Sequence, residues 1–213
     1  MKKLFTLLAL TITFSMNAQL TAVTEGGNTG QRLSTSNASN HGDIGSNAVD
    51  LSYQSSTSST RGATGVRAVA MGLKTTASGT NSTAMGNLTT ASGNQTTAMG
   101  FQSTASGDSS TAIGRSTTAS GSYSTAMGQS TTASGDNSTA LGYYTSASGG
   151  YGAIAMGNQT TASGANSTVM GEGGTASGAA STAMGRGTTA SDYASLVIGP
   201  VSYTHLTLPT RIF

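Results

Sequence analysis

The feature that most constrains this chain is a 14-residue repeat, which runs from about residue 63 to residue 199. Each copy contains an apolar residue followed by glycine, and every spacing between these pairs is 14 residues except one of 15. A second motif, such as TASG at residues 90–93, comes seven residues after each pair, so every repeat has two halves. A short fixed period of this kind indicates a solenoid. The apolar residues are Met71, Met85, Met99, Ile113, Met127, Leu141, Met156, Met170, Met184 and Ile198.

The composition of each half favours β structure over helix. Seven residues accommodate a strand of four or five plus a tight two-residue connection, with Thr suited to the strand and Gly to the corner. A glycine in every half would cost a helix about 1 kcal/mol each. We therefore predict an all-β fold, a parallel β-solenoid of 14-residue coils with two short strands per coil. Rungs about 4.8 Å apart would give a rod of roughly 43 Å.

The two halves differ at one informative position. Ala and Gly occur in both halves on one side of the pleat, whereas the residue between them is Met in one half and Ser in the other. We expect Ala and Gly to line a narrow interior, which leaves an apolar stripe on one outer face and a hydroxyl ladder on the other. Soluble monomers rarely expose a long apolar row, so the ten apolar residues are predicted to pack against other copies of the chain. The alternative is that they lie inside a monomeric roll, with Ala outside.

Sequence variation concentrates in the connections that follow the apolar-Gly pairs. These connections fall at the same corner of successive coils, and exposed aromatic and charged side chains there are the best candidates for ligand contacts. Ordinary solvated corners are the alternative interpretation. The candidates are Lys74, Phe101, Arg115, Tyr143, Tyr144 and Arg186. One extra residue within 149–154 predicts a bulged corner.

Both ends of the chain depart from the repeat. Residues 1–18 have a basic start at Lys2 and Lys3, a short apolar run and a small residue, Ala18, and are typical of a signal peptide. Export as a secreted chain is therefore expected. Residues 19–62 lack the rhythm and are interpreted as an N-terminal cap with flexible segments, whereas residues 63–199 form the roll. Residues 200–213 do not continue the repeat, resemble translated sequencing-adapter sequence and are predicted to be non-native.

Composition argues against several classes of function. Without Lys2 and Lys3, seven basic residues face seven acidic ones, so no nucleic-acid partner is implied. The chain has no cysteine for disulfides or thiolate metal sites. Its two histidines, His41 and His205, lie in the irregular ends, away from the abundant hydroxyl side chains of the repeat. We therefore expect no catalytic residues, no bound metal and no cofactor, and hence no enzyme.

The repeat resembles a known family. The sequences NSTAMG at 81–86, NSTALG at 137–142 and NSTVMG at 166–171 follow the pattern of the head domain of YadA-like trimeric autotransporter adhesins. The resemblance covers about two thirds of the chain. It implies a left-handed β-roll and a homotrimer that is secreted or held at the outer-membrane surface of a Gram-negative bacterium. It also implies adhesion to host matrix, host cells or other bacteria.

Two other functions remain open. Thr90, Ser92 and their equivalents would form a regular hydroxyl ladder, as an ice-binding or other surface-adsorbing solenoid requires, although Ser lacks the methyl group that such ladders display. Thermal hysteresis would be its signature. The third possibility is a passive structural spacer.

Overall fold

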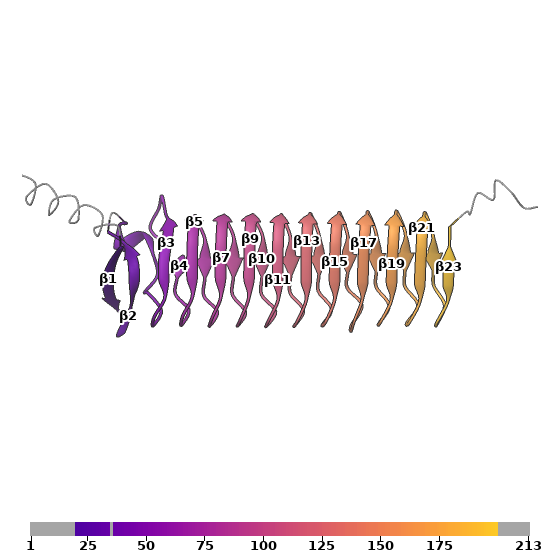
Figure 1. Cartoon of the computed structure of the whole chain (residues 1–213), viewed down its shortest axis with the longest axis horizontal. Coiled ribbons are helices and arrows are strands. Elements are labelled where there is room, and N and C mark those ends of the chain that lie inside the picture. The colour runs from indigo at the N-terminus through magenta and orange to yellow at the C-terminus, as the bar shows by residue number, and fades with distance from the viewer. Residues whose placement is uncertain (1–19, 35, 200–213) are drawn as a thin grey trace, which may run out of the picture.

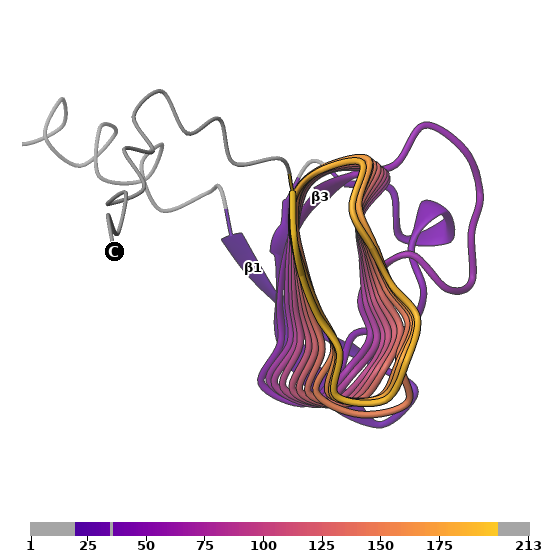
Figure 2. The same cartoon turned by 90° about the vertical axis from the view of Figure 1, so that its right-hand side faces the viewer.

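The computed structural model describes residues 20–34 and 36–199. The predicted signal peptide and the predicted non-native tail lie outside these residues. The chain winds into a straight rod of stacked coils (Figure 1), and each coil presents one strand to each of two facing sheets (Figure 2). The predicted all-β parallel solenoid is confirmed.

A 13-stranded sheet runs the length of the rod and contains the TAMG-like half of every repeat. We call it the long-strand sheet. Neighbouring strands pair in parallel with partners 14 residues apart, for example Ala98 with Ala112 and Met99 with Ile113. Its repeat strands are β5 (Val69–Leu73), β7 (Thr83–Asn87), β9 (Thr97–Phe101), β11 (Thr111–Arg115), β13 (Thr125–Gln129), β15 (Thr139–Tyr143), β17 (Ile154–Asn158), β19 (Thr168–Glu172), β21 (Thr182–Arg186) and β23 (Leu196–Ile198).

A 10-stranded sheet contains the TASG-like halves, and we call it the short-strand sheet. Its strands are β4 (Gly62–Ala63), β6 (Thr76–Ala77), β8 (Thr90–Ala91), β10 (Thr104–Ala105), β12 (Thr118–Ala119), β14 (Thr132–Ala133), β16 (Ser146–Ala147), β18 (Thr161–Ala162), β20 (Thr175–Ala176) and β22 (Thr189–Ala190).

The coils wind in a left-handed sense. In Figure 1 the long strands lie in front and point upward while successive coils advance to the right. Figure 2 is seen from the C-terminal end and places the long strands on the left, so a chain that rises there descends on the right and turns clockwise as it approaches the viewer. The handedness implied by the family resemblance therefore holds.

The strands of the short-strand sheet have two residues rather than the four or five that we predicted. Hydrogen bonding explains the difference. The backbone N–H groups of Ser106 and Gly107 both donate to the carbonyl of Ala119, at 2.9 and 3.3 Å. Because two consecutive N–H groups share one acceptor, the ladder ends at the alanine and the chain turns there.

The interior is lined by alanine and by small hydroxyl side chains. Ala84 and Ala91, one from each sheet, are fully buried, as are their equivalents in most coils. Thr89 and Ser82, which lie next to the corners, are buried as well. Alanine was predicted to lie inside, whereas the interior position of these hydroxyl residues was not recognised.

The two glycine series behave differently, and only one was predicted correctly. Gly93 of the TASG half is buried, but Gly100 of the TAMG half is exposed. Gly100 adopts φ +111°, and a Cβ atom there would collide with the carbonyl oxygen of Gly114 in the next coil. This glycine is therefore required by a positive φ and a close rung-to-rung approach, not by a narrow interior.

The single insertion is absorbed at a corner. Asp136 pairs with Tyr151, and Leu141 pairs with Met156 in the following strands, so the strand register is unchanged across the longer coil. Gly150 is the extra residue; it is exposed, and no atom lies within 4 Å of where its Cβ would be.

The N-terminal unit, residues 20–62, precedes the regular coils. The strands β1 (Leu20–Glu25) and β2 (Asn28–Leu33) form an antiparallel hairpin at the N-terminal edge of the long-strand sheet. A short 3-10 helix, η1 (Ala38–Asn40), follows, and then β3 (Val49–Tyr53). Because β3 pairs with β5 over its whole length, from Val49 with Val69 to Tyr53 with Leu73, the stacking begins upstream of residue 63.

Within residues 20–34 and 36–199, the structure contains no helix long and apolar enough to cross a membrane.

Candidate functional site

The outer face of the long-strand sheet carries the ten apolar residues of the repeat, which we call the apolar stripe. They follow the buried alanines, so the pleat directs them away from the interior. Met71, Met127 and Ile198 are exposed and the other members are partly exposed. Strand register places each member beside the next, as Met85 pairs with Met99 and Met99 with Ile113. The alternative in which the methionines fill the interior of a monomer is therefore wrong, because alanine occupies it.

The opposite face, on the short-strand sheet, carries hydroxyl side chains. Thr90 is partly exposed and Ser92 is exposed, and they flank the buried Ala91. The threonines stay in register from coil to coil, as Thr90 pairs with Thr104. A regular hydroxyl ladder is thus present, whereas ice binding stays a prediction.

A third surface, which we call the corner ridge, lies where the long strands end. Strand pairing places one residue of each coil in a continuous rank along the rod, and Figure 1 shows these strand ends along one line. Four of the six predicted ligand-contact residues, Phe101, Arg115, Tyr143 and Arg186, belong to this rank. Its members are Tyr53, Leu73, Asn87, Phe101, Arg115, Gln129, Tyr143, Asn158, Glu172 and Arg186.

The other two predicted contact residues, Lys74 and Tyr144, occupy the next position of the corner. There the backbone adopts a left-handed conformation, with φ +54° at Lys74 and +52° at Tyr144. Side chains along the ridge touch one another. The guanidinium of Arg115 lies 5.9 Å from the centre of the Phe101 ring, and the rings of Tyr143 and Tyr144 meet edge to face at 4.5 Å.

A buried charged cluster, which the sequence did not indicate, joins the N-terminal hairpin to the first coil. Asp50 is fully buried and stands at the position that alanine occupies in later coils, as its pairing with Ala70 shows. Its Oδ2 atom lies 2.8 Å from Nδ1 of His41 and 3.5 Å from Nε of Arg32. Its Oδ1 atom accepts hydrogen bonds from the backbone N–H and the hydroxyl of Ser52, at 3.0 and 2.6 Å.

These contacts determine the ionisation of the cluster. Burial raises the pKa of the Asp50 carboxyl, but hydrogen bonds from His41 and Ser52 outweigh burial and hold the pKa below its usual 3.8. On the hairpin side, Arg32 donates to Oε1 of Glu25 at 2.7 Å and to the carbonyl of Gly42 at 3.0 Å. The carboxylate of Asp50 is therefore charged at neutral pH and anchors side chains from β2 and from the segment after η1.

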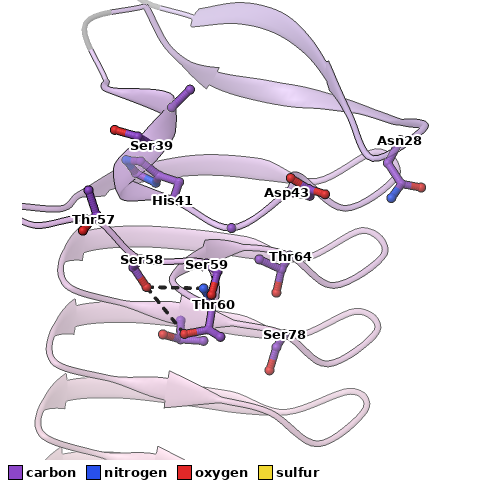
Figure 3. A pocket seen from close by; sticks show the side chains of 13 residues that line it. Asn28, Ser39, His41, Asp43, Thr57, Ser58, Ser59, Thr60, Thr64 and Ser78 are labelled. Carbon is purple, nitrogen blue, oxygen red and sulfur yellow. Dashed lines mark hydrogen bonds between the residues drawn. The ribbon is translucent and has the colours of Figure 1, made fainter.

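The cluster borders an open polar groove of about 1140 Å³ (Figure 3). Hydroxyl side chains from residues 57–60 and from the first short strands line most of it, together with Asn28 and Asp43. His41 and Ser58 both line the groove, but the Ser58 oxygen accepts hydrogen bonds from the backbone N–H groups of Thr60 and Arg61, at 3.3 and 3.2 Å. The Ser58 hydroxyl therefore stabilises the turn of its own loop and is not positioned as a nucleophile beside a base.

Among the residues that the structure describes, no group of three or more His, Cys, Asp or Glu side chains could hold a metal ion. The residues that the repeat places at regular intervals lie on the long surfaces of the rod and not in the groove. They can supply apolar contact, aromatic stacking and hydrogen bonding to partners that extend along the axis.

A comparison with protein families identifies the repeat. The family described as YadA head domain repeat, whose unit spans two copies, matches residues 63–89, 91–117, 119–145, 148–172 and 176–202. These segments cover more than half of the chain, and the last extends three residues past the predicted end of the array. No curated protein matches the chain.

Proposed function

Because the chain belongs to the YadA head domain repeat family, we propose that it is the head of a trimeric surface adhesin that attaches to host or bacterial surfaces through many weak contacts. Three identical rods would present the same contacts side by side, which raises avidity through effective concentration rather than through the strength of any one contact. The expected location is the exterior of a Gram-negative bacterium. The fold serves this role by display of surfaces and needs no catalytic group.

The apolar stripe is the observation that carries the proposal. A row of partly exposed side chains that extends along ten rungs is longer than soluble monomers usually leave in water. Burial of the row against the same row of two other copies removes it from water, and each rung contributes a matching contact. A trimer interface made of the stripe leaves the hydroxyl face of every rod pointing outward.

A pair of charge substitutions tests the proposal. Met127→Glu places a carboxylate in the middle of the stripe, where burial of an unpaired charge is costly, and we expect the trimer to dissociate into folded monomers. Ser134→Glu places the same charge on the hydroxyl face and should leave the trimer intact. Light scattering after gel filtration gives the mass, and circular dichroism confirms the fold. A monomeric wild type, or a trimer that tolerates Met127→Glu, contradicts the proposal.

A further inference from the structure

The corner ridge carries aromatic rings at equal intervals. From Tyr53 the pairing runs through Leu73 and Asn87 to Phe101, which is three rungs. From Phe101 it runs through two further coils to Tyr143, which is again three rungs. With about 4.8 Å per rung, the rings stand roughly 14 Å apart along a straight line. Their exposed fractions are 66%, 37% and 43%, so each ring is open to a ligand.

Three of the four rungs between the rings carry hydrogen-bonding side chains, and the fourth carries Leu73. Asn87 precedes Phe101 and Gln129 precedes Tyr143 in the rank, and each amide can both donate and accept. Arg115 places its guanidinium over one face of the Phe101 ring, which leaves the other face for a sugar. The acidic member, Glu172, is ion-paired at 3.5 Å with Arg186. The ridge therefore alternates apolar platforms with polar groups and offers more free positive than negative charge.

We infer that the corner ridge binds an extended polysaccharide chain of β-linked pyranose sugars. The C–H face of a pyranose ring stacks on an aromatic ring, and its hydroxyl groups bond to amide side chains. Sugars of an extended chain follow one another at a spacing close to one rung, so every third sugar meets a ring. The sugars between the rings meet a polar side chain at three rungs and Leu73 at the fourth. This inference deepens the proposed function, because it names the ligand class for the surface expected to make contacts.

Extended peptides fit this surface less well. The long strands at the ridge are hydrogen-bonded to a neighbour on both sides, so a peptide finds no free edge to extend. A polyproline II helix repeats every three residues, which is about 9 Å, and does not match ring intervals of about 14 Å. The ring spacing therefore favours the glycan.

Affinity electrophoresis of the secreted chain tests the inference. We expect retardation in gels that contain hydroxyethylcellulose or hyaluronan, which are extended β-linked chains, and none with amylose, which coils. Phe101→Ala and Tyr143→Ala should each weaken retardation at least about fivefold, as removal of a central aromatic contact does. Tyr123→Ala is the matched control, because this tyrosine is exposed at the opposite corner of the coil, and it should bind as wild type.

Arg115→Gln separates neutral from acidic glycans, since it should weaken binding to hyaluronan alone. Absence of retardation by both β-linked polymers overturns the inference, as does equal retardation by amylose or an equal loss in Tyr123→Ala. If the chain binds the glycan but proves to be a monomer, the proposed trimer is wrong and the proposed glycan site on the ridge stands. If the chain forms a trimer but binds neither polymer, the glycan site is wrong and the trimer stands.

Discussion

The N-terminal unit and the repeat array share one sheet but are stabilised in opposite ways. In β3 the interior position is Asp50, a buried carboxylate that is hydrogen-bonded to His41 and Ser52 and ion-paired with Arg32. In every coil from β5 to β21 the same position is alanine or, once, Val169, and the rungs are held by backbone ladders and close packing. Among the described residues, buried charged side chains are confined to the N-terminal unit. The coil that carries the charged cluster pairs with a hairpin of different sequence, whereas the alanine coils pair with one another.

The largest expected effect comes from the array. Gly100→Ala forces a side chain into φ +111° and places Cβ against the carbonyl of Gly114, so we expect a loss of about 3–5 kcal/mol in the free energy of unfolding. Gly173→Ala is the matched control, because Gly173 has φ +63° but no atom within 4 Å of its Cβ site. That control should cost about 1 kcal/mol. Urea unfolding followed by circular dichroism measures both; equal losses would disprove the rung-to-rung explanation.

The charged cluster should produce a smaller and local effect. Asp50→Ala gives β3 the interior residue of the array but leaves His41 without its carboxylate and Arg32 with Glu25 alone, at a cost of about 3 kcal/mol to the N-terminal unit. Repeats contact only their neighbours, so the central coils should be unaffected. Hydrogen exchange should accelerate in β1 to β3 and stay slow in β9 to β13. Asp192→Ala, which removes an exposed carboxylate at a corner of the last coil, is the control. Acceleration throughout the rod would show that the two regions unfold as one.

One coil within the array tests how tightly its interior is filled. Val169 replaces the usual alanine, and Gly174 replaces the usual threonine, in the same coil. A Cβ atom at Gly174 would lie 2.9 Å from Cγ2 of Val169, so Gly174→Thr should destabilise by about 1–3 kcal/mol. The double change Val169→Ala with Gly174→Thr restores the common pair and should recover most of that loss. If the changes in unfolding free energy of the two single variants simply add in the double variant, positions 169 and 174 do not compete for the same space.

The smallest expected effect is a pH dependence that only the N-terminal unit shows. Because the folded pKa of Asp50 lies below its usual 3.8, the carboxylate contributes stability above that pH. This contribution is lost as the pH falls through the folded-state value. Hydrogen exchange at successively lower pH should therefore show β1 and β2 opening before the coils do. In Asp50→Asn, the difference in hydrogen-exchange rate between the N-terminal unit and the coils should stay constant as the pH is lowered. Loosening of the coils first would contradict the assignment.

The N-terminal unit and the repeat array also differ in how much of their structure could be predicted from the sequence. The period of Ala84, Met85 and their equivalents was enough to predict the solenoid, the alanine interior and the outward stripe. The exposure of Gly100 was missed because pleat alternation fails where φ becomes positive. Asp50, Arg32 and His41 are separated by 9 or more residues with no rhythm, so only the fold brings them together. The equal spacing of rings on the ridge was hidden because Tyr53 precedes the repeat and joins the rank only through β3.

Methionine oxidation tests the outward stripe and its burial between copies most directly. Exposed thioethers oxidise to sulfoxides, whereas those that are buried are protected. In the wild type, Met85, Met99, Met156 and Met170 should be protected by the neighbouring copies, and in the folded Met127→Glu monomer all four should oxidise rapidly. Protection in both proteins would place the methionines in the interior of the monomer, and rapid oxidation in the wild type would leave the stripe open to water. Either result would contradict the account.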